Sequence, residues 1–123
     1  PRPSEVPMLL SEKHCVPCRK GTPSLDEATI RLLLGDVAGW SVESTPGKPT
    51  SIAKRYDFVD FLAAMAFVDK MAAVAEAEGH HPDFCVHYSR VDVSLSTHAA
   101  RGLTENDFIL AAKLDALLPG TKA

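Results

Sequence analysis

Residues 84–97 carry the pattern that most restricts the fold, an alternation of apolar and polar side chains that changes parity once. Apolar or β-branched side chains occupy even positions first, at 84, 86 and 88, and odd positions afterwards, at 91, 93, 95 and 97. Because successive side chains of a strand point to opposite faces, the chain must turn or bulge at Ser89 and Arg90 to keep this set on one face. We interpret the segment as two antiparallel strands, with Tyr88 in the core.

The stretch before these strands predicts a long helix that is apolar around much of its circumference. Its apolar side chains include Phe58, Phe61, Leu62, Met65, Val68, Met71, Val74 and Ala75. Asp57 is expected to cap its start, and Gly79 to end it after about Glu78. A helix that is apolar over so wide an arc is buried on two sides, which predicts contacts with the sheet and with a second subunit.

A helix and two further strands are expected earlier in the chain. Ser24 followed by Glu27 has the pattern of a capping box, which predicts a helix that ends at Gly39. Residues 40–43 and 50–56 predict two strands, because the segment between them is rich in proline and glycine and is typical of a turn.

A last helix is predicted to begin at Thr104, with Asp107 at its third position, and to stop at Pro119. The order of elements is then α-β-β-α-β-β-α. This order predicts the α+β class, with a four-stranded antiparallel sheet and helices packed on one face. Residues 1–23 are rich in proline and are expected to form an extended arm, followed by a single domain over residues 24–123.

Composition argues against two classes of partner. A formal net charge of -3 lacks the basic excess of a nucleic-acid-binding protein, so no direct binding of nucleic acid is expected. The most apolar stretch, residues 58–77, is interrupted by charged side chains, so no membrane span is expected. Residues 1–10 lack the apolar core of a secretory signal, which favours a cytoplasmic location.

The arm contains a Cys-x-x-Cys unit, Cys15 and Cys18, with His14 beside it and cationic side chains around it. Nearby cations lower the pKa of a thiol and make it reactive or able to bind a metal. A structural zinc site needs four ligands, however, and the sequence has no second Cys-x-x-Cys. Two interpretations stay open, a redox or metal role and a surface turn before the first helix.

Three histidines are the strongest candidates for chemistry: His80 and His81, followed by Pro82, and His98. An imidazole with an ordinary pKa of about 6.5 exchanges protons near neutral pH. Glu76 precedes His80 by four residues, so its carboxylate is expected to orient that ring from one helical turn below. His98 shares the parity of the polar side of the second strand and is expected to reach the same cleft.

The spacing of these residues is similar to that of a known family. The positions that carry the resemblance are Glu76, His80, His81, Pro82, Asp83, Tyr88, Ser96, Thr97, His98, Gly102, Leu103, Thr104 and Asp107. From about Leu25 to Leu118, the chain closely resembles the pterin-4a-carbinolamine dehydratases. Two positions depart from the usual family pattern, Phe84 where tryptophan is common and Gly79 where asparagine is common.

The resemblance implies an enzyme without cofactor or metal that removes water from 4a-hydroxytetrahydropterin to give quinonoid dihydropterin. It implies His80, His81 and His98 as catalytic residues. It implies that the pterin and the histidines are held by Glu76, Gly79, Pro82, Ser96, Thr97, Ala99 and Asp107. Members of the family typically pair into homodimers through their sheets and into homotetramers through their helices.

Other interpretations are weighed beside this one. His80 and His81 can simply be polar residues that interact favourably with the dipole of a helix C-terminus. The three histidines can instead bind zinc, although adjacent histidines on an extended backbone tend to diverge. A third hypothesis is a non-catalytic interaction or assembly module with the same fold, which the presence of all three histidines disfavours.

Overall fold

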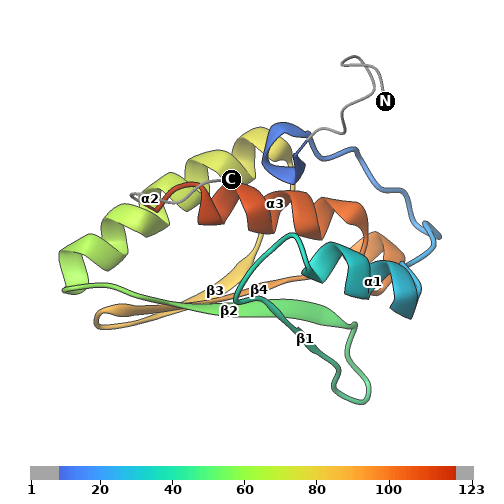
Figure 1. The fold of residues 1–123 in the computed structure, drawn as a ribbon, viewed down its shortest axis with the longest axis horizontal. Helices are drawn as coiled ribbons and strands as arrows, with labels where there is room; N and C mark the ends of the chain where they lie inside the picture. Colours follow the sequence, from blue (N-terminus) through green and yellow to red (C-terminus); the bar gives the residue numbers. More distant parts are fainter. Residues whose placement is uncertain (1–8, 119–123) are drawn as a thin grey trace.

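The computed structural model describes residues 9–118 of the chain. Its elements in chain order are η2 (Leu10–Glu12), α1 (Glu27–Leu34), β1 (Ser41–Glu43), β2 (Ser51–Asp57), α2 (Phe61–Glu78), β3 (Asp83–His87), β4 (Arg90–Leu95), η3 (His98–Ala100) and α3 (Glu105–Asp115). The predicted order and the α+β class are confirmed. Figure 1 shows the α-helices on one side of the sheet, and no other element of the described chain covers the opposite side.

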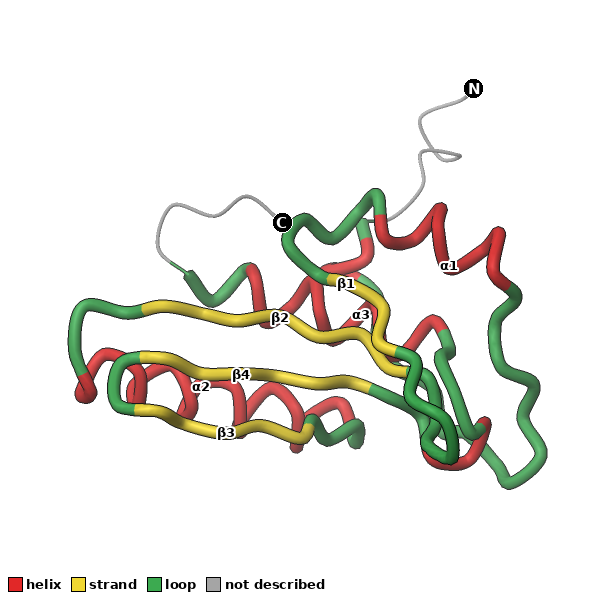
Figure 2. Tube along the Cα trace, turned by 90° about the horizontal axis from the view of Figure 1, so that it is seen from below, coloured by secondary structure: helices red, strands yellow, loops and turns green. Residues whose placement is uncertain are grey.

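The strands form one antiparallel sheet in the order β1-β2-β4-β3 (Figure 2). Val86 pairs with Val91, and Phe84 pairs with Val93. This register puts the even positions of β3 and the odd positions of β4 on one face, so the predicted parity change is confirmed. Tyr88 is a correction, because it occupies the turn itself, with a φ of 52°, and is 72% exposed rather than in the core.

The core lies between the sheet and helices α2 and α3. Its completely buried large side chains include Ile52, Met71, Val91, Val93, Leu95, Phe108, Leu110 and Leu114. Each such side chain contributes about 1.5–3 kcal/mol to stability, so the central strand β4 is held firmly on its inner face. Ser96 and His98 follow β4 directly in the chain. The packing of β4 in the core therefore determines where these two candidate site residues lie.

Both ends predicted for the first helix are wrong. Asp26, not Ser24, caps α1, because its Oδ1 accepts a hydrogen bond from Thr29 N at 2.8 Å. The helix ends before Gly35. Gly39 lies beyond it, with a φ of 84°, in the turn that leads into β1.

The start predicted for the long helix is also wrong, whereas its end is confirmed. Asp60 caps α2 by accepting a hydrogen bond from Ala63 N at 2.8 Å. Asp57 cannot do so, because it is the last residue of β2, where its carboxylate pairs with Arg55 at 3.0 Å. Gly79 ends α2 in the left-handed conformation, with a φ of 64°, which glycine adopts without steric penalty.

The capping box of the last helix is confirmed. Thr104 N donates a hydrogen bond to Asp107 Oδ2 at 3.0 Å at the start of α3. The helix ends at Asp115, and the predicted stop at Pro119 lies outside the described residues.

Asp115 connects this last helix to the sheet. Its carboxylate accepts hydrogen bonds from Trp40 Nε1 at 3.2 Å, Lys54 Nζ at 2.8 Å and Tyr56 Oη at 2.5 Å. Burial, together with the Asp115 carboxylate, raises the pKa of the Tyr56 phenol. Its partners thus come from β2 and from the residue before β1, and the carboxylate holds both against α3.

The described part of the arm, residues 9–23, packs on the helices. Leu10 is buried in the core, and Lys113 Nζ donates to Ser11 O at 2.9 Å. Lys13 pairs with Glu105 at 2.9 Å. These contacts place the Cys-x-x-Cys unit, residues 15–18, beside the first turn of α3. None of the described helices combines the length and apolar character that crossing a membrane requires.

Candidate active site

A cleft of about 430 Å³ lies where the end of α2, the start of β3 and the chain after β4 meet. The predicted site residues that line it are Gly79, His80, His81, Pro82, Ser96, Thr97, His98 and Ala99. Glu76 and Asp107 are not among the lining residues, but each holds one of the histidines that are. The structure therefore brings together the residues that the sequence pattern singled out.

His80 is held by a buried carboxylate. Its Nε2 lies 2.6 Å from Oδ1 of Asp107, which is completely buried. The second oxygen of that carboxylate accepts hydrogen bonds from Thr97 Oγ1 at 2.8 Å and from Thr104 N at 3.0 Å. Because the carboxylate engages Nε2 as a donor, Nδ1 of His80 is the nitrogen left for proton exchange.

The predicted pairing of Glu76 with His80 is wrong, because Glu76 holds His81. The distance between Glu76 Oε1 and His81 Nε2 is 2.8 Å. The reason is the left-handed turn at Gly79, which ends the helical spacing just before the histidines and directs His80 toward α3. Both side chains of the Glu76–His81 pair are exposed, at 81% and 64%, so water screens this interaction strongly.

His98 reaches the cleft from a different element than expected. β4 ends at Leu95, and His98 is the first residue of η3 instead of lying on the polar side of the strand. An isolated bridge between Thr97 and Gly102 closes the short loop that carries it. Its ring is exposed and makes no side-chain hydrogen bond with residues 9–118, so both nitrogens are available to a ligand.

The hydroxyl groups beside His98 have partners within the protein. Ser96 Oγ donates to Thr50 O at 2.9 Å. Thr97 Oγ1 donates to Asp107 and also lies 2.8 Å from Thr104 Oγ1. These bonds fix the backbone at the rim of the cleft, between the β4 core and α3.

One wall of the cleft comes from residues that the sequence analysis did not connect with the histidines. Cys15, Val16, Pro17 and Cys18 of the arm line it, together with Glu78 and Asn106. The side chain of Asn106 is the anchor of this wall. Its Nδ2 donates to Val16 O at 2.7 Å, and its Oδ1 accepts from Val16 N at 3.0 Å. These contacts span 90 positions in sequence, so no local pattern signals them.

The charge environment of Cys15 is the opposite of the one expected. Burial raises the pKa of its thiol to about 12, and the Glu78 carboxylate adds to the increase. Glu78 accepts a hydrogen bond from Cys15 N at 2.7 Å and lies 2.8 Å from His14 Nδ1. The lysine and arginine neighbours in sequence therefore do not activate Cys15, which stays a neutral thiol at physiological pH.

The same contacts stabilise the charged form of Glu78. Burial alone raises the pKa of a carboxyl group, but the hydrogen bonds from Cys15 and His14 and the nearby Lys113 outweigh it, and the pKa of Glu78 is lowered. The carboxylate is thus a charged anchor for the arm at the edge of the cleft. Among residues 9–118, no group of three or more histidine, cysteine, aspartate or glutamate side chains is arranged to hold a metal ion.

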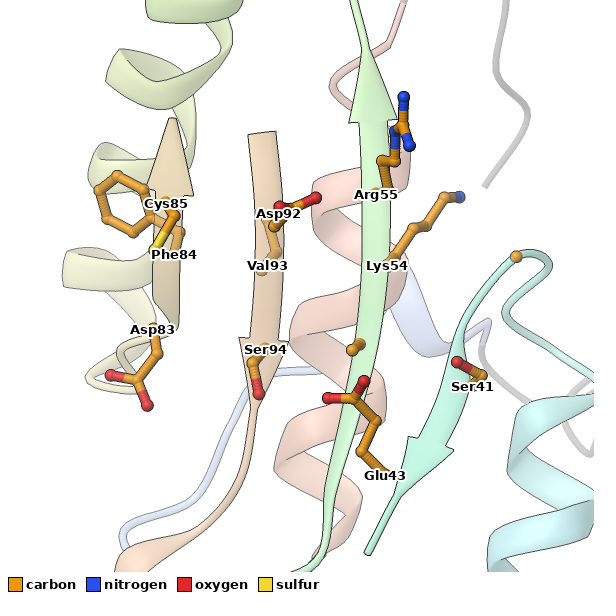
Figure 3. A pocket seen from close by; sticks show the side chains of 12 residues that line it. Ser41, Glu43, Lys54, Arg55, Asp83, Phe84, Cys85, Asp92, Val93 and Ser94 are labelled. Atoms are coloured by element: carbon orange, nitrogen blue, oxygen red, sulfur yellow. The ribbon is translucent and has the colours of Figure 1, made fainter. Parts of the chain in front are cut away.

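A larger cavity, of about 580 Å³, lies on the uncovered face of the sheet (Figure 3). Its polar side chains include Glu43, Arg55, Asp83 and Asp92, and its described lining contains no histidine. The cleft at the end of α2 combines concavity with histidines that contact carboxylates, a combination typical of an active site.

The fold and this cleft together define a small α+β domain in which three histidines line one cleft. The protein family follows from comparison with known proteins. The family model described as pterin 4 alpha carbinolamine dehydratase matches residues 23–117. The chain belongs to the pterin-4a-carbinolamine dehydratase family.

Individual relatives agree with this assignment. A protein of Halorhodospira halophila is 43% identical over 110 residues, which are 89% of this chain and 98% of the relative. One of Stenotrophomonas maltophilia is 44% identical over 108 residues, 88% of this chain and 90% of the relative. Both carry the name "Putative pterin-4-alpha-carbinolamine dehydratase".

Solved structures share the fold. A transcriptional coactivator/pterin dehydratase from Brucella melitensis has a TM-score of 0.69 and 35% identity, covering 76% of this chain and 97% of that one. A pterin dehydratase-like protein, described as a RuBisCO assembly factor in the alpha-carboxysome, has a TM-score of 0.56 and 28% identity, covering 68% and 93%.

Proposed function

We propose that this chain is a dehydratase that removes water from 4a-hydroxytetrahydropterin and yields quinonoid dihydropterin, in the recycling of tetrahydropterin. The observation that carries the proposal is the convergence of His80, His81 and His98 on one cleft, with carboxylates behind the first two. Family membership supports the same reaction.

The reaction needs one proton donor and one proton acceptor. An acid protonates the hydroxyl group on C4a, the bond between that carbon and oxygen breaks, and water leaves. The lone pair of the adjacent ring nitrogen forms the new double bond, and a base removes a proton from nitrogen. Imidazoles do both, and each positioned acid or base typically contributes about 10² to 10⁴ in rate.

The surroundings of the histidines suggest a division of labour. Asp107 holds the ring of His80 in a buried contact, whereas the contact of Glu76 with His81 is exposed and holds that ring more loosely. His98 lines the same cleft and has no side-chain partner among the described residues. We assign the C4a hydroxyl and the nitrogen proton to opposite sides of the pterin, one facing the pair and the other facing His98.

The exposed apolar part of α2 supports a homo-oligomer. Phe61 is 46% exposed and Leu62 is 76% exposed on its first turn. Large apolar side chains that face solvent on a helix are typical of an interface between subunits. We propose that α2 packs against a second copy of the chain, in a homodimer or homotetramer.

A second candidate function is a non-catalytic assembly or coactivator role, which is favoured by the descriptions of the two solved relatives. The discriminating experiment follows dehydration of freshly generated 4a-hydroxytetrahydropterin with and without the protein, for the wild type, His81→Ala and His98→Ala. We expect each variant to lower kcat by about 10² or more while the circular dichroism spectrum is retained.

The matched control is His87→Ala. His87 is a histidine of β3 outside the cleft, where its Nε2 lies 3.7 Å from Asp92 Oδ2. Its replacement leaves kcat at the wild-type value if the cleft is the active site. A folded wild-type protein that does not accelerate dehydration would refute the dehydratase proposal and leave the assembly role.

A further inference from the structure

A second concave region lies directly beside the histidine cleft and shares His98 with it. This cavity has a volume of about 640 Å³, and its described lining is Gly47, Lys48, Pro49, His98 and Arg101. Lys48 comes from the loop between β1 and β2, whereas Arg101 follows η3. Two cations and no carboxylate therefore face a space that begins where the cleft ends.

The charges at this end of the molecule differ from those elsewhere on its surface. Six lysine and arginine side chains pair with carboxylates, namely Lys13, Arg31, Lys54, Arg55, Arg90 and Lys113. Those that form no ion pair with a carboxylate of residues 9–118 are Arg19, Lys20, Lys48, Lys70 and Arg101.

All of these unpaired cations except Lys70 lie around η3. Gly21 N donates a hydrogen bond to Ala99 O at 3.3 Å, which brings the preceding Arg19 and Lys20 beside that element. Of the cations in residues 9–118 without a carboxylate partner there, Lys48 and Arg101 line the same cavity as His98. Such an arrangement attracts an anion and repels a cation.

Arg101 occupies a position whose backbone gives no reason for an arginine. Its φ is 54°, in the left-handed region that residues with a Cβ seldom adopt. The turn is held by Arg101 N, which donates to His98 O at 3.1 Å, and by Gly102 N, which donates to Thr97 O at 3.4 Å. Glycine adopts this turn more readily, so the backbone does not account for an arginine at this position. The hydrogen-bond donors of the guanidinium group match a phosphate.

We propose that Lys48 and Arg101 form an anion subsite for a phosphate on the side chain of the pterin substrate. This inference rests on the proposed function and narrows its substrate class to phosphorylated tetrahydropterins. Because His98 lines both spaces, a ligand whose ring lies among the histidines extends its substituent directly into the cationic cavity. A phosphate monoester carries a charge of about -1.5 to -2 at pH 7, which suits a lysine and an arginine together.

The kinetic test compares two 4a-hydroxytetrahydropterins that differ only in a phosphate on the C6 side chain. The wild type is expected to have a kcat/KM about tenfold higher for the phosphorylated substrate, and added salt is expected to reduce that ratio. The double variant Lys48→Gln/Arg101→Asn removes both charges, and asparagine tolerates the left-handed turn. It is expected to bring the ratio close to one.

The matched control is Lys70→Gln, which removes an unpaired cation from α2, away from both cavities. It is expected to keep the wild-type ratio. A ratio of one in the wild type would overturn the subsite while leaving the dehydratase proposal intact.

A binding measurement separates the failure of the two proposals. Oxidised, fluorescent pterins with and without the side-chain phosphate are titrated into the wild type and the double variant, with no turnover required. Tighter binding of the phosphorylated pterin to the wild type alone supports the subsite, even if dehydration is absent and the proposed function fails. Equal affinity of the wild type for both pterins overturns the subsite. The subsite is overturned in the same way if the wild type does not distinguish the pterins and the cationic surface binds an acidic protein segment instead.

Discussion

Nε2 of His80 lies 2.6 Å from Oδ1 of Asp107, and this contact joins the turn after α2 to the first turn of α3. The same carboxylate caps α3 through Thr104 N. One buried group therefore contacts both the start of a helix and a candidate catalytic ring, and it ties the position of the ring to that helix.

The first prediction concerns this carboxylate. Asp107→Asn keeps the shape of the side chain but removes the charge that engages Nε2 of His80, and its amide group competes as a donor. We expect kcat for dehydration to fall by about 10² or more. Stopped-flow rates and the pH profile of kcat measure the effect. Asp92→Asn, on the uncovered face of the sheet, is the control, and an equal loss there would contradict a specific role for Asp107.

A second prediction tests the attachment of the arm. Asn106→Ala removes both hydrogen bonds to Val16 and leaves backbone groups unpaired, which costs roughly 1–3 kcal/mol of stability. Urea unfolding gives that free energy. Labelling of Cys18 by a thiol reagent is expected to become faster at the same time, because Asn106 Nδ2 lies 3.3 Å from Cys18 Sγ. Unchanged labelling would mean that Asn106 does not hold the wall of the cleft.

The third prediction is a dependence of stability on pH. The pKa of Glu78 is lower in the folded protein than its ordinary value, so its stabilising contribution is complete above that ordinary value and is lost as the pH falls through the folded pKa. Between about pH 5 and pH 2, the free energy of unfolding should fall less in Glu78→Gln than in the wild type.

The Glu78 experiment also needs a neutral-pH comparison. There, Glu78→Gln should be destabilised by roughly 1–3 kcal/mol, because charged hydrogen bonds to the buried carboxylate are weakened. Glu43→Gln, which replaces an exposed carboxylate on β1, is expected to follow the wild-type curve. Parallel acid curves for the wild type and Glu78→Gln would show that the arm is not anchored by this charge.

A fourth prediction concerns the connection between α3 and the sheet. Asp115→Ala leaves Trp40, Lys54 and Tyr56 without their shared acceptor, and Lys54 is only 19% exposed. Because this ion pair is only partly buried, its loss is expected to cost less than the roughly 3–5 kcal/mol typical of a fully buried pair. Unfolding followed by the fluorescence of Trp40, the single tryptophan, reports the loss directly. Asp69→Asn on the exposed side of α2 serves as the control and should change stability by less than about 0.5 kcal/mol.

The sequence predicted the order of the elements because each carries a local signal. The parity change around Ser89 and the glycine after α2 depend on neighbours along the chain, and both are confirmed. The helix starts predicted at Ser24 and Asp57 were wrong because a nearby aspartate, Asp26 or Asp60, takes the capping position within three residues of each. The propensity of a residue for the helix N-cap does not decide between two neighbouring candidates. The path of the flanking chain decides which of them caps the helix.

For the candidate site, too, the sequence predicted the features with a local signal and missed those that depend on distant contacts. The spacing of the histidines found the cleft, but the partner of His80 depends on the turn at Gly79, and the turn sends that ring to Asp107 instead of Glu76. The wall formed by residues 15–18 is set by contacts with Asn106 that span about 90 positions. A pattern read along one chain detects neighbours on the same element and misses contacts of this length.

The placement of residues 15–18 against the histidines also bears on where a functional unit begins. The family model starts at residue 23, so a chain trimmed to that boundary loses the arm residues that line one side of the cleft, Cys15 and Cys18 among them. A shorter piece that begins at residue 23 would carry the three histidines into another protein without the wall that the arm adds to their cleft.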